Sequence, residues 1–202
     1  MFPCLAILDP IACVAMRIVF IGPPGAGKGT QSVRLADALG ITSLSTGEVL
    51  RAAQASDTPA GREIAARLKA GQLVSDDLVL RIVTDRLADA DCCHGYLFDG
   101  FPRTLPQAEE LDKLMADHNT RLDAAVLFEA GEEELLRRLA GRGRADDKEE
   151  LIRQRLKDYA ALTEPLANYY ESRGVLRRIA AVGTPEEVFS RIEEALGGFA
   201  GR

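Results

Sequence analysis

A glycine-rich segment at residues 22–30, GPPGAGKGT, carries the strongest chemical signal in the chain. Small residues let the backbone wrap around phosphate oxygens, and a helix that starts there directs its N–H groups at the anion. Lys28 can reach the β- and γ-phosphates of a nucleotide as a point charge. The pattern GxxxxGK[ST] is met up to Lys28, but Gly29 stands where Ser or Thr is usual. Thr30 follows one position later and is the hydroxyl expected near Mg²⁺.

Arginine is the second signal, because it makes up most of the 25 basic residues. It stays charged and grips phosphate oxygens with a planar fork of N–H groups. Most of these side chains are expected to be solvated surface charges, among them Arg137, Arg138 and Arg153. A subset of the arginines is expected to bind phosphate instead.

Two other polar residues each have a structural and a functional interpretation. Asp99 follows an apolar run, and its structural interpretation is a buried residue that caps the next turn. Gln107 ends the sequence Thr104-Leu105-Pro106-Gln107. This sequence reads as a capping box, in which the glutamine reaches back to the helix start. On local grounds alone, the cap is the favoured interpretation.

Five short apolar runs supply the elements that would position these groups: 18–21, 41–44, 96–98, 124–128 and 175–179. They are bounded by Gly, Asp or Ser and mostly lack alternating polar residues. This pattern is typical of strands buried on both faces of a parallel sheet. Helical patterns separate the runs, so the chain is predicted to form an open α/β fold with right-handed crossovers.

Two helical segments are well marked. In residues 28–39 the apolar positions are expected to form one buried stripe: Val33, Leu35, Ala36 and Leu39. At 184–187, an N-cap threonine, a proline at the first helical position and a glutamate at the third predict a capping box. The helix that follows carries a second apolar stripe: Val188, Phe189, Ile192 and Leu196.

Residues 45–74 and 141–147 interrupt the alternation of strands and helices. The first segment has a helical pattern, and the second is a short polar loop that begins with glycine. The chain has 202 residues and shows no internal repeat or linker. We therefore interpret both segments as inserts on a single domain at 16–202.

The composition is that of an ordinary globular protein, with 47% hydrophobic and 28% charged residues. The net charge of -6 argues against broad electrostatic binding to nucleic acid or to an anionic membrane, while it permits a local basic pocket. No apolar stretch of the roughly 18 residues that a membrane helix needs is present. The four cysteines lack metal-binding spacing and are expected to be free thiols in a reducing compartment: Cys4, Cys13, Cys92 and Cys93.

Residues 1–15 are apolar but are interrupted by Pro3, Asp9 and Pro10, and they lack the basic start of a secretory signal. Our preferred interpretation is a wrongly assigned upstream start, with Met16 as the functional first residue. A short disordered or surface-packed tail is the main alternative, and a targeting segment is a weaker one.

From the glycine-rich loop onward, the chain resembles the adenylate kinases of the nucleoside monophosphate (NMP) kinase family. The matching stretches are GPPGAGKGTQ at 22–31, LSTGEVLR at 44–51, GQLVSDDLV at 71–79, FDGFPRT at 98–104 and GRGRADDKEE at 141–150. The resemblance covers residues 16–196. It implies a P-loop NTPase-type open five-stranded parallel sheet flanked by helices, with an NMP-binding insert at 45–74 and a short lid at 141–147.

The resemblance also implies which residues bind the two nucleotides. The ATP site would comprise Gly25, Ala26, Gly27, Lys28, Gly29, Thr30, Arg142 and Gly183. The AMP site would comprise Thr46, Arg51, Gln72, Leu73, Val74, Gly100, Phe101, Pro102, Arg103, Gln107, Arg144 and Arg155. Four of the basic residues would be catalytic: Lys28, Arg103, Arg144 and Arg155. Mg²⁺ carried with ATP would be held indirectly by Thr30 and Asp99. Gln107 would then hydrogen-bond the adenine of AMP, a role that is compatible with the cap.

The activity implied is reversible phosphoryl transfer from MgATP to AMP, giving two ADP. The alternatives are a UMP/CMP kinase, whose members tend to replace Thr46 by Ala and Gln107 by Asn, and a nucleotide-binding protein without turnover. No general base is expected, since the acceptor is already an ionised phosphate and catalysis rests on positioning and electrostatics.

The remaining expectations concern the histidines, zinc, and the location and partners of the protein. His94 and His118 lie outside all motifs. The segment 141–147 holds no Cys or His, so no structural zinc is expected. The resemblance implies a cytoplasmic monomer that binds ATP, AMP and ADP, with no nucleic acid or membrane partner.

Overall fold

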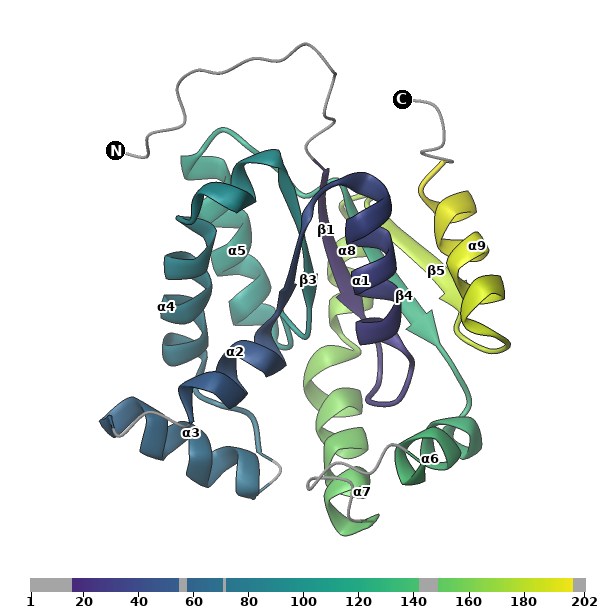
Figure 1. Cartoon of the computed structure of the whole chain (residues 1–202), viewed down its shortest axis with the longest axis horizontal. Helices are drawn as coiled ribbons and strands as arrows, with labels where there is room; N and C mark the ends of the chain where they lie inside the picture. Colours follow the sequence, from purple (N-terminus) through teal and green to yellow (C-terminus); the bar gives the residue numbers. More distant parts are fainter. Residues whose placement is uncertain (1–15, 55–57, 71, 142–148, 198–202) are drawn as a thin grey trace.

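The computed structural model describes residues 16–54, 58–70, 72–141 and 149–197. Five parallel strands form one sheet in the order β2-β3-β1-β4-β5 (Figure 1). Their bounds are β1 Met16–Ile21, β2 Thr42–Ser45, β3 Gly95–Asp99, β4 Ala124–Glu129 and β5 Leu176–Ala180. The predicted five-stranded parallel sheet is confirmed. Of the residues in the five predicted apolar runs, only Ile41 and Val175 lie outside the strands, each one residue before its strand begins.

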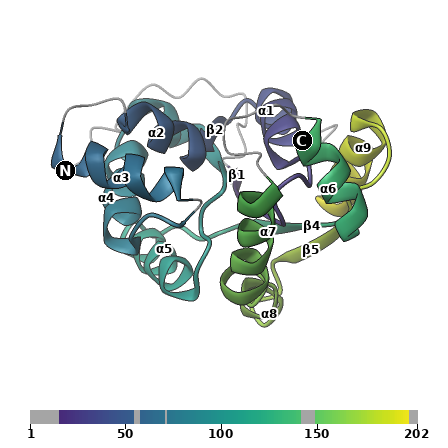
Figure 2. The same ribbon diagram turned by 90° about the horizontal axis from the view of Figure 1, so that it is seen from below.

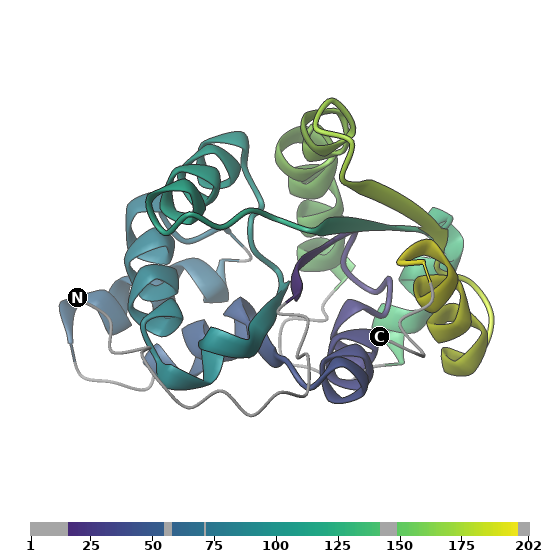
Figure 3. The same cartoon turned by 90° about the horizontal axis from the view of Figure 1, so that it is seen from above.

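Helices connect the strands and cover both faces of the sheet, as Figure 3 shows in a view from above Figure 1. Their bounds are α1 Lys28–Leu39, α2 Thr46–Ala53, α3 Pro59–Lys69, α4 Asp76–Leu87, α5 Leu105–Asp117, α6 Glu132–Ala140, α7 Glu149–Asp158, α8 Leu166–Glu171 and α9 Pro185–Ala195. A 3-10 turn, η1, spans Ala90–His94, and a π-helical turn, η2, spans Tyr159–Thr163. Within the described ranges, no helix is long and apolar enough to cross a bilayer.

Successive strand residues point to opposite faces and bury into two separate apolar clusters. Val19 and Ile21 of β1 belong to the cluster that contains α4, α5 and α8. Ile18 and Phe20 belong to the cluster that contains α1, α6 and α9. Burial on both faces explains why the strands read as continuous apolar runs rather than as an alternating pattern.

The bounds of helix α1 agree with the prediction, but one member of its buried stripe does not. Leu35 and Ala36 are buried, whereas Val33 is 56% exposed. At 100° per residue, position 33 lies about 200° around the helix from position 35, on the solvent side. The buried face continues instead through Gln31 and Ser32. The capping box predicted for α9 is confirmed, with Thr184 and Glu187 each accepting a hydrogen bond from the other's backbone N–H.

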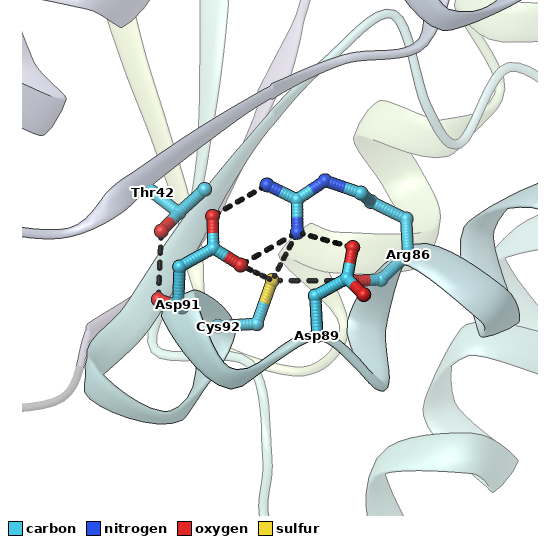
Figure 4. A network of polar contacts seen from close by, with 5 residues as sticks. All are labelled: Thr42, Arg86, Asp89, Asp91 and Cys92. Carbon is cyan, nitrogen blue, oxygen red and sulfur yellow. Dashed lines mark hydrogen bonds and ion pairs between the residues drawn. The ribbon is translucent and has the colours of Figure 1, made fainter.

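A polar network fastens α4 and η1 to the start of β2 (Figure 4). Arg86 donates to Asp91 at 2.6 Å and to Asp89 at 3.1 Å, and Thr42 Oγ1 donates to the Asp91 carbonyl at 2.7 Å. Cys92 packs inside this network as a free thiol, and burial raises its pKa to about 11. The thiol is therefore neutral near pH 7, and the network is structural.

The two inserts differ in how much of them can be described. Residues 45–74 form α2 and α3, which pack against each other below the strands in Figure 1. Of the segment 141–147, only Gly141 lies inside the described residues, as the C-cap of α6. Residues 1–15, with Cys4 and Cys13, also lie outside them.

Two adjacent tyrosines allow a test of the core. Tyr170 is fully buried, and no described group forms a hydrogen bond with its hydroxyl. Tyr169 donates to Asp112 at 2.7 Å. Because an unsatisfied buried hydroxyl is unfavourable, Tyr170→Phe should leave the free energy of unfolding unchanged or raise it by up to about 1 kcal/mol.

The matched variant, Tyr169→Phe, should lower that free energy by about 1–2 kcal/mol, since it deletes a hydrogen bond to a carboxylate. Urea denaturation of both variants checks the pair. Equal destabilisation by the two substitutions would contradict the assignment of Tyr170.

Candidate nucleotide-binding site

Parallel strands place all their carboxyl ends at one edge of the sheet, where open α/β folds bind ligands. The glycine-rich loop follows β1, Thr46 follows β2 and Gly100 follows β3. Viewed toward this edge, α2 and α3 stand on one side of the strands and α6 and α7 on the other (Figure 2). The topology therefore gathers the sequence motifs at one end of the molecule.

The phosphate loop is shaped by close packing against α6. Gly25 has φ +87°, and a Cβ there would stand 2.9 Å from Leu139 Cγ, so glycine is required for both backbone and space. Lys28 begins α1 and donates from Nζ to the carbonyls of Gly22 at 2.7 Å and Pro23 at 2.9 Å. These bonds hold the ammonium group at the loop, where a phosphate would be cradled.

Asp99 lies beside the first turn of α1. Its Oδ2 is 3.3 Å from the position that a Cβ on Gly29 would occupy. A serine or threonine side chain at position 29 would therefore crowd this carboxylate, which gives a physical reason for glycine in the usual Ser/Thr place. Within the described ranges, the Asp99 carboxylate accepts no hydrogen bond, so the alternative of a buried cap gains no support.

Arg103 is the centre of a cluster of positive charge. The residue is exposed to solvent at the end of the loop after β3. Desolvation lowers the pKa of its guanidinium, Asp99 offsets this effect, and the like charges of Arg155 and Arg51 lower the pKa further. Three arginines from three different elements thus converge beside one carboxylate. Such a cluster is suited to a ligand with several negative oxygens.

The backbone of Arg103 is held at both of its polar groups. Its N–H donates to Gln107 Oε1 at 2.8 Å, and its carbonyl accepts from Thr163 Oγ1 at 2.8 Å. Thr163 is buried and lies in the π-helical turn η2, a type of turn that is frequent at functional sites. Sequence reasoning missed Thr163, because nothing in the local pattern predicts a π-helical turn.

Gln107 is only 3% exposed, and its side chain does not make the contact that the predicted capping box requires. Thr104 Oγ1 does accept from the Gln107 N–H at 3.3 Å, so half of the box is present. The Gln107 side chain, however, accepts from Arg103 N–H rather than from Thr104. Its Nε2 donates to Asp76 Oδ1 at 2.6 Å. Asp76 was not among the predicted site residues.

Thr46, at the start of α2, is buried, and no described group forms a hydrogen bond with its Oγ1. A buried hydroxyl without a partner calls for an explanation, and a bound ligand is one. Arg51 lies one turn after Gly47 in α2, and its Nη1 is 3.1 Å from the position that a Cβ on Gly47 would occupy. In the segment that joins α3 to α4, Val74 is buried, Leu73 is half-buried and Gln72 is exposed.

The loop after β5 contains Gly183, whose φ is +105°. It is tied to the phosphate-loop helix, because Gln31 Nε2 donates to the Pro185 carbonyl at 2.8 Å. Arg138 was predicted to be an ordinary surface charge, and this is wrong. Its side chain is 23% exposed, against 72% for Arg137, and its Nη1 stands 3.9 Å from the Cβ position of Gly27. Glu134 holds it there with a 2.6 Å hydrogen bond.

Comparison with known proteins agrees with this arrangement. The family model for adenylate kinase matches residues 20–175. An adenylate kinase of Thermus thermophilus is 50% identical over 188 residues, which cover 91% of this chain and 98% of the relative. The chain belongs to the adenylate kinase family. Adenylate kinases of Mycolicibacterium smegmatis and Thermodesulfovibrio yellowstonii are 48% and 41% identical, covering 90% and 88% of this chain and 99% and 97% of the relatives.

Most, but not all, of the residues expected from the adenylate kinase resemblance can be placed. Lys28, Asp99, Arg51, Arg103 and Arg155 come together at the carboxyl ends of the strands. Arg142 and Arg144 lie outside the described residues, so their positions stay predictions. Phe101 and Pro102, joined by a cis peptide bond, are buried directly before Arg103 in the chain.

Thr163 gives a test of how Arg103 is positioned. Thr163→Val keeps the side-chain volume but removes the hydrogen bond to the Arg103 carbonyl. We expect the KM for AMP, the acceptor expected from the sequence, to rise about tenfold, the value of roughly one hydrogen bond. The KM for ATP should stay unchanged. Thr163→Ser keeps the hydroxyl and should behave like the wild type; steady-state kinetics with equal effects for Val and Ser would contradict this role.

Proposed function

We propose that this chain transfers the γ-phosphoryl group of MgATP reversibly to AMP, giving two ADP. The observation that carries the proposal is the convergence of Arg51, Arg103 and Arg155 beside the phosphate loop. Two polyanions must meet in line for this reaction, and closely placed arginines offset the repulsion between them. The family membership supports the same reaction.

The acceptor nucleotide is proposed to lie between α2 and the loop after β3. Arg51 and Arg103 bind its phosphate, together with Gly100, Phe101 and Pro102. Thr46 and Gln107 contact its adenine, with Gln72, Leu73 and Val74 wrapping the base. The buried hydroxyl of Thr46, which has no hydrogen-bond partner among the described residues, supports this placement, because a base or ribose would satisfy it.

The donor nucleotide is proposed to lie on the phosphate loop. Backbone N–H groups from Gly25 to Thr30 and the Lys28 ammonium would cradle its phosphates, and Gly183 would lie near its base. Arg138 is added to the donor side, because its guanidinium stands over Gly27. Arg142, from the proposed lid at 141–147, would contact ATP as well.

Asp99 and Thr30 fit the Mg²⁺ ion that accompanies ATP. The Asp99 carboxylate borders the first turn of α1, where the missing side chain of Gly29 leaves room beside it. Carboxylate and hydroxyl oxygens suit this hard cation, which usually keeps several waters. We propose that both residues hold the ion through water, and that the ion neutralises phosphate charge when bound.

The chain's own residues then act by position and charge. Arg103, Arg144 and Arg155 would hold the transferring phosphoryl group between the two nucleotides, and Lys28 would hold it from the donor side. No side chain needs to remove a proton, since the acceptor oxygen is already ionised. Water must be excluded from the cleft, or ATP would be hydrolysed instead. A cytoplasmic monomer is proposed as the working state.

The acceptor is tested with MgATP and each of the four ribonucleoside monophosphates in a coupled assay. We expect AMP to be phosphorylated fastest, because Thr46 and Gln107 offer polar contacts to adenine. A base that leaves these buried groups unpaired should be rejected. Faster phosphorylation of UMP or CMP would overturn the assignment in favour of the UMP/CMP kinase alternative.

The proposed lid is tested with Arg144→Ala. We expect turnover to fall at least about 100-fold with an unchanged melting temperature, since a positioned arginine stabilises the charge of the transferring group. Arg153→Ala is the matched control, because Arg153 is 60% exposed and pairs only with Glu149 among the described groups. Near-normal turnover of Arg144→Ala would refute the role; nucleotide binding without turnover in the wild type would favour the non-catalytic alternative.

A further inference from the structure

A carboxylate that belongs to none of the proposed nucleotide contacts lies directly against Gln107. Asp76 is the first residue of α4 and is half-buried. Its Oδ1 accepts from Gln107 Nε2 at 2.6 Å, and its Oδ2 accepts from Thr104 Oγ1 at 2.9 Å. Both oxygens are therefore used to hold the beginning of α5. Asp76 also follows Val74 by two residues, so it joins the base-wrapping stretch to Gln107.

The partners of Gln107 define which way its amide points. A glutamine amide can turn by 180° with little change in shape, which exchanges its oxygen and nitrogen. An ionised carboxylate only accepts hydrogen bonds, so the nitrogen must face Asp76. The Arg103 N–H only donates, so the oxygen must face Arg103. Turning the amide would break both hydrogen bonds. It would place the amide oxygen against the Asp76 carboxylate and the amide N–H groups against the Arg103 N–H.

The fixed amide keeps one unused N–H and one unused oxygen lone pair. Adenine offers a donor at its 6-amino group beside the N1 acceptor, and a fixed amide can pair with both. A 6-oxopurine such as hypoxanthine offers an acceptor at O6 beside an N1–H donor, which is the reversed pattern. Only a turned amide would match the 6-oxopurine.

We propose that Asp76 is a positioning residue that locks Gln107 in the orientation that selects 6-aminopurine over 6-oxopurine monophosphates. The inference rests on the proposed function, in which Gln107 contacts the acceptor base. Asp76 itself touches neither nucleotide. Its effect passes through the Gln107 amide, so it acts on acceptor selectivity and not on the chemical step.

The test is Asp76→Asn, which keeps the size of the side chain but replaces an acceptor-only group with one that can donate or accept. Full-length enzyme is assayed with MgATP and either AMP or IMP. We expect the KM for AMP to rise about tenfold and the AMP-to-IMP ratio of kcat/KM to fall about tenfold, the change for about one charge-assisted hydrogen bond. The KM for ATP and the kcat with saturating AMP should stay within about twofold.

Asp77→Asn is the matched control. Asp77 stands in the same first helical turn, is exposed, and loses the same charge on substitution, so any effect of helix polarity is shared. This control should leave both constants unchanged. Asp76→Ser gives a second variant that suits a helix N-terminus and lacks the carboxylate. It should reproduce the loss of selectivity if Asp76→Asn folds poorly.

Gln107→Leu separates this inference from the proposed function. If Gln107→Leu lowers the AMP-to-IMP ratio while both Asp76 variants leave it unchanged, the role of Asp76 is wrong and the acceptor site stands. If Gln107→Leu also leaves the ratio unchanged, Gln107 does not read the base, and the proposed adenine contact falls with the inference. A loss of selectivity in Asp77→Asn equal to that in Asp76→Asn would likewise overturn it.

Discussion

Positive charge concentrated at one point is the constraint on which the rest of this molecule depends. Desolvation above all lowers the pKa of Arg103, the like charges of Arg155 and Arg51 lower it further, and the Asp99 carboxylate opposes the shift. Holding like charges together costs free energy that the packed core must supply. The backbone hydrogen bonds from Gln107 and Thr163 serve this purpose, because they fix Arg103 against its neighbours. A polyanionic ligand relieves the repulsion, so its binding stabilises the folded chain.

The parallel sheet is what makes this concentration of charge feasible. Arg51, Arg103 and Arg155 stand far apart along the chain, yet the carboxyl ends of the strands bring them to a single edge. The same edge carries the phosphate loop after β1, the central strand of the sheet. The opposite edge contains the Arg86 network, where every charge has a close partner. One end of the sheet is thus arranged for internal stability and the other for binding anions.

Much of this arrangement could be predicted from the sequence, because the decisive signals are local. The phosphate loop, the buried strands and the capping box at Thr184 each depend on residues within a few positions of one another. The exposed Val33 shows where a local rule fails, since hydrophobicity alone does not define the face of a helix that packs.

The features that the sequence did not predict depend on contacts between distant segments. Asp76 and Gln107 are separated by 31 positions, and Thr163 reaches Arg103 across 60. In the sequence, Arg138 cannot be told apart from its exposed neighbour Arg137. Only the fold shows that Arg138 is less exposed and lies near Gly27 of the phosphate loop. No periodicity encodes such contacts. For Arg142 and Arg144, the family resemblance stays the sole guide.

The sheet also separates two apolar clusters, and this has an evolutionary consequence. Helices α2, α3, α4 and α5, which surround the proposed acceptor site, pack into one cluster, whereas α1 and α9, near the proposed donor site, pack into the other. Substitutions that lie far apart and share no neighbours combine nearly independently. Substitutions in one apolar cluster can therefore accumulate during evolution without matching changes in the other. Only the residues at the strand ends, where the two nucleotides would meet, must change together.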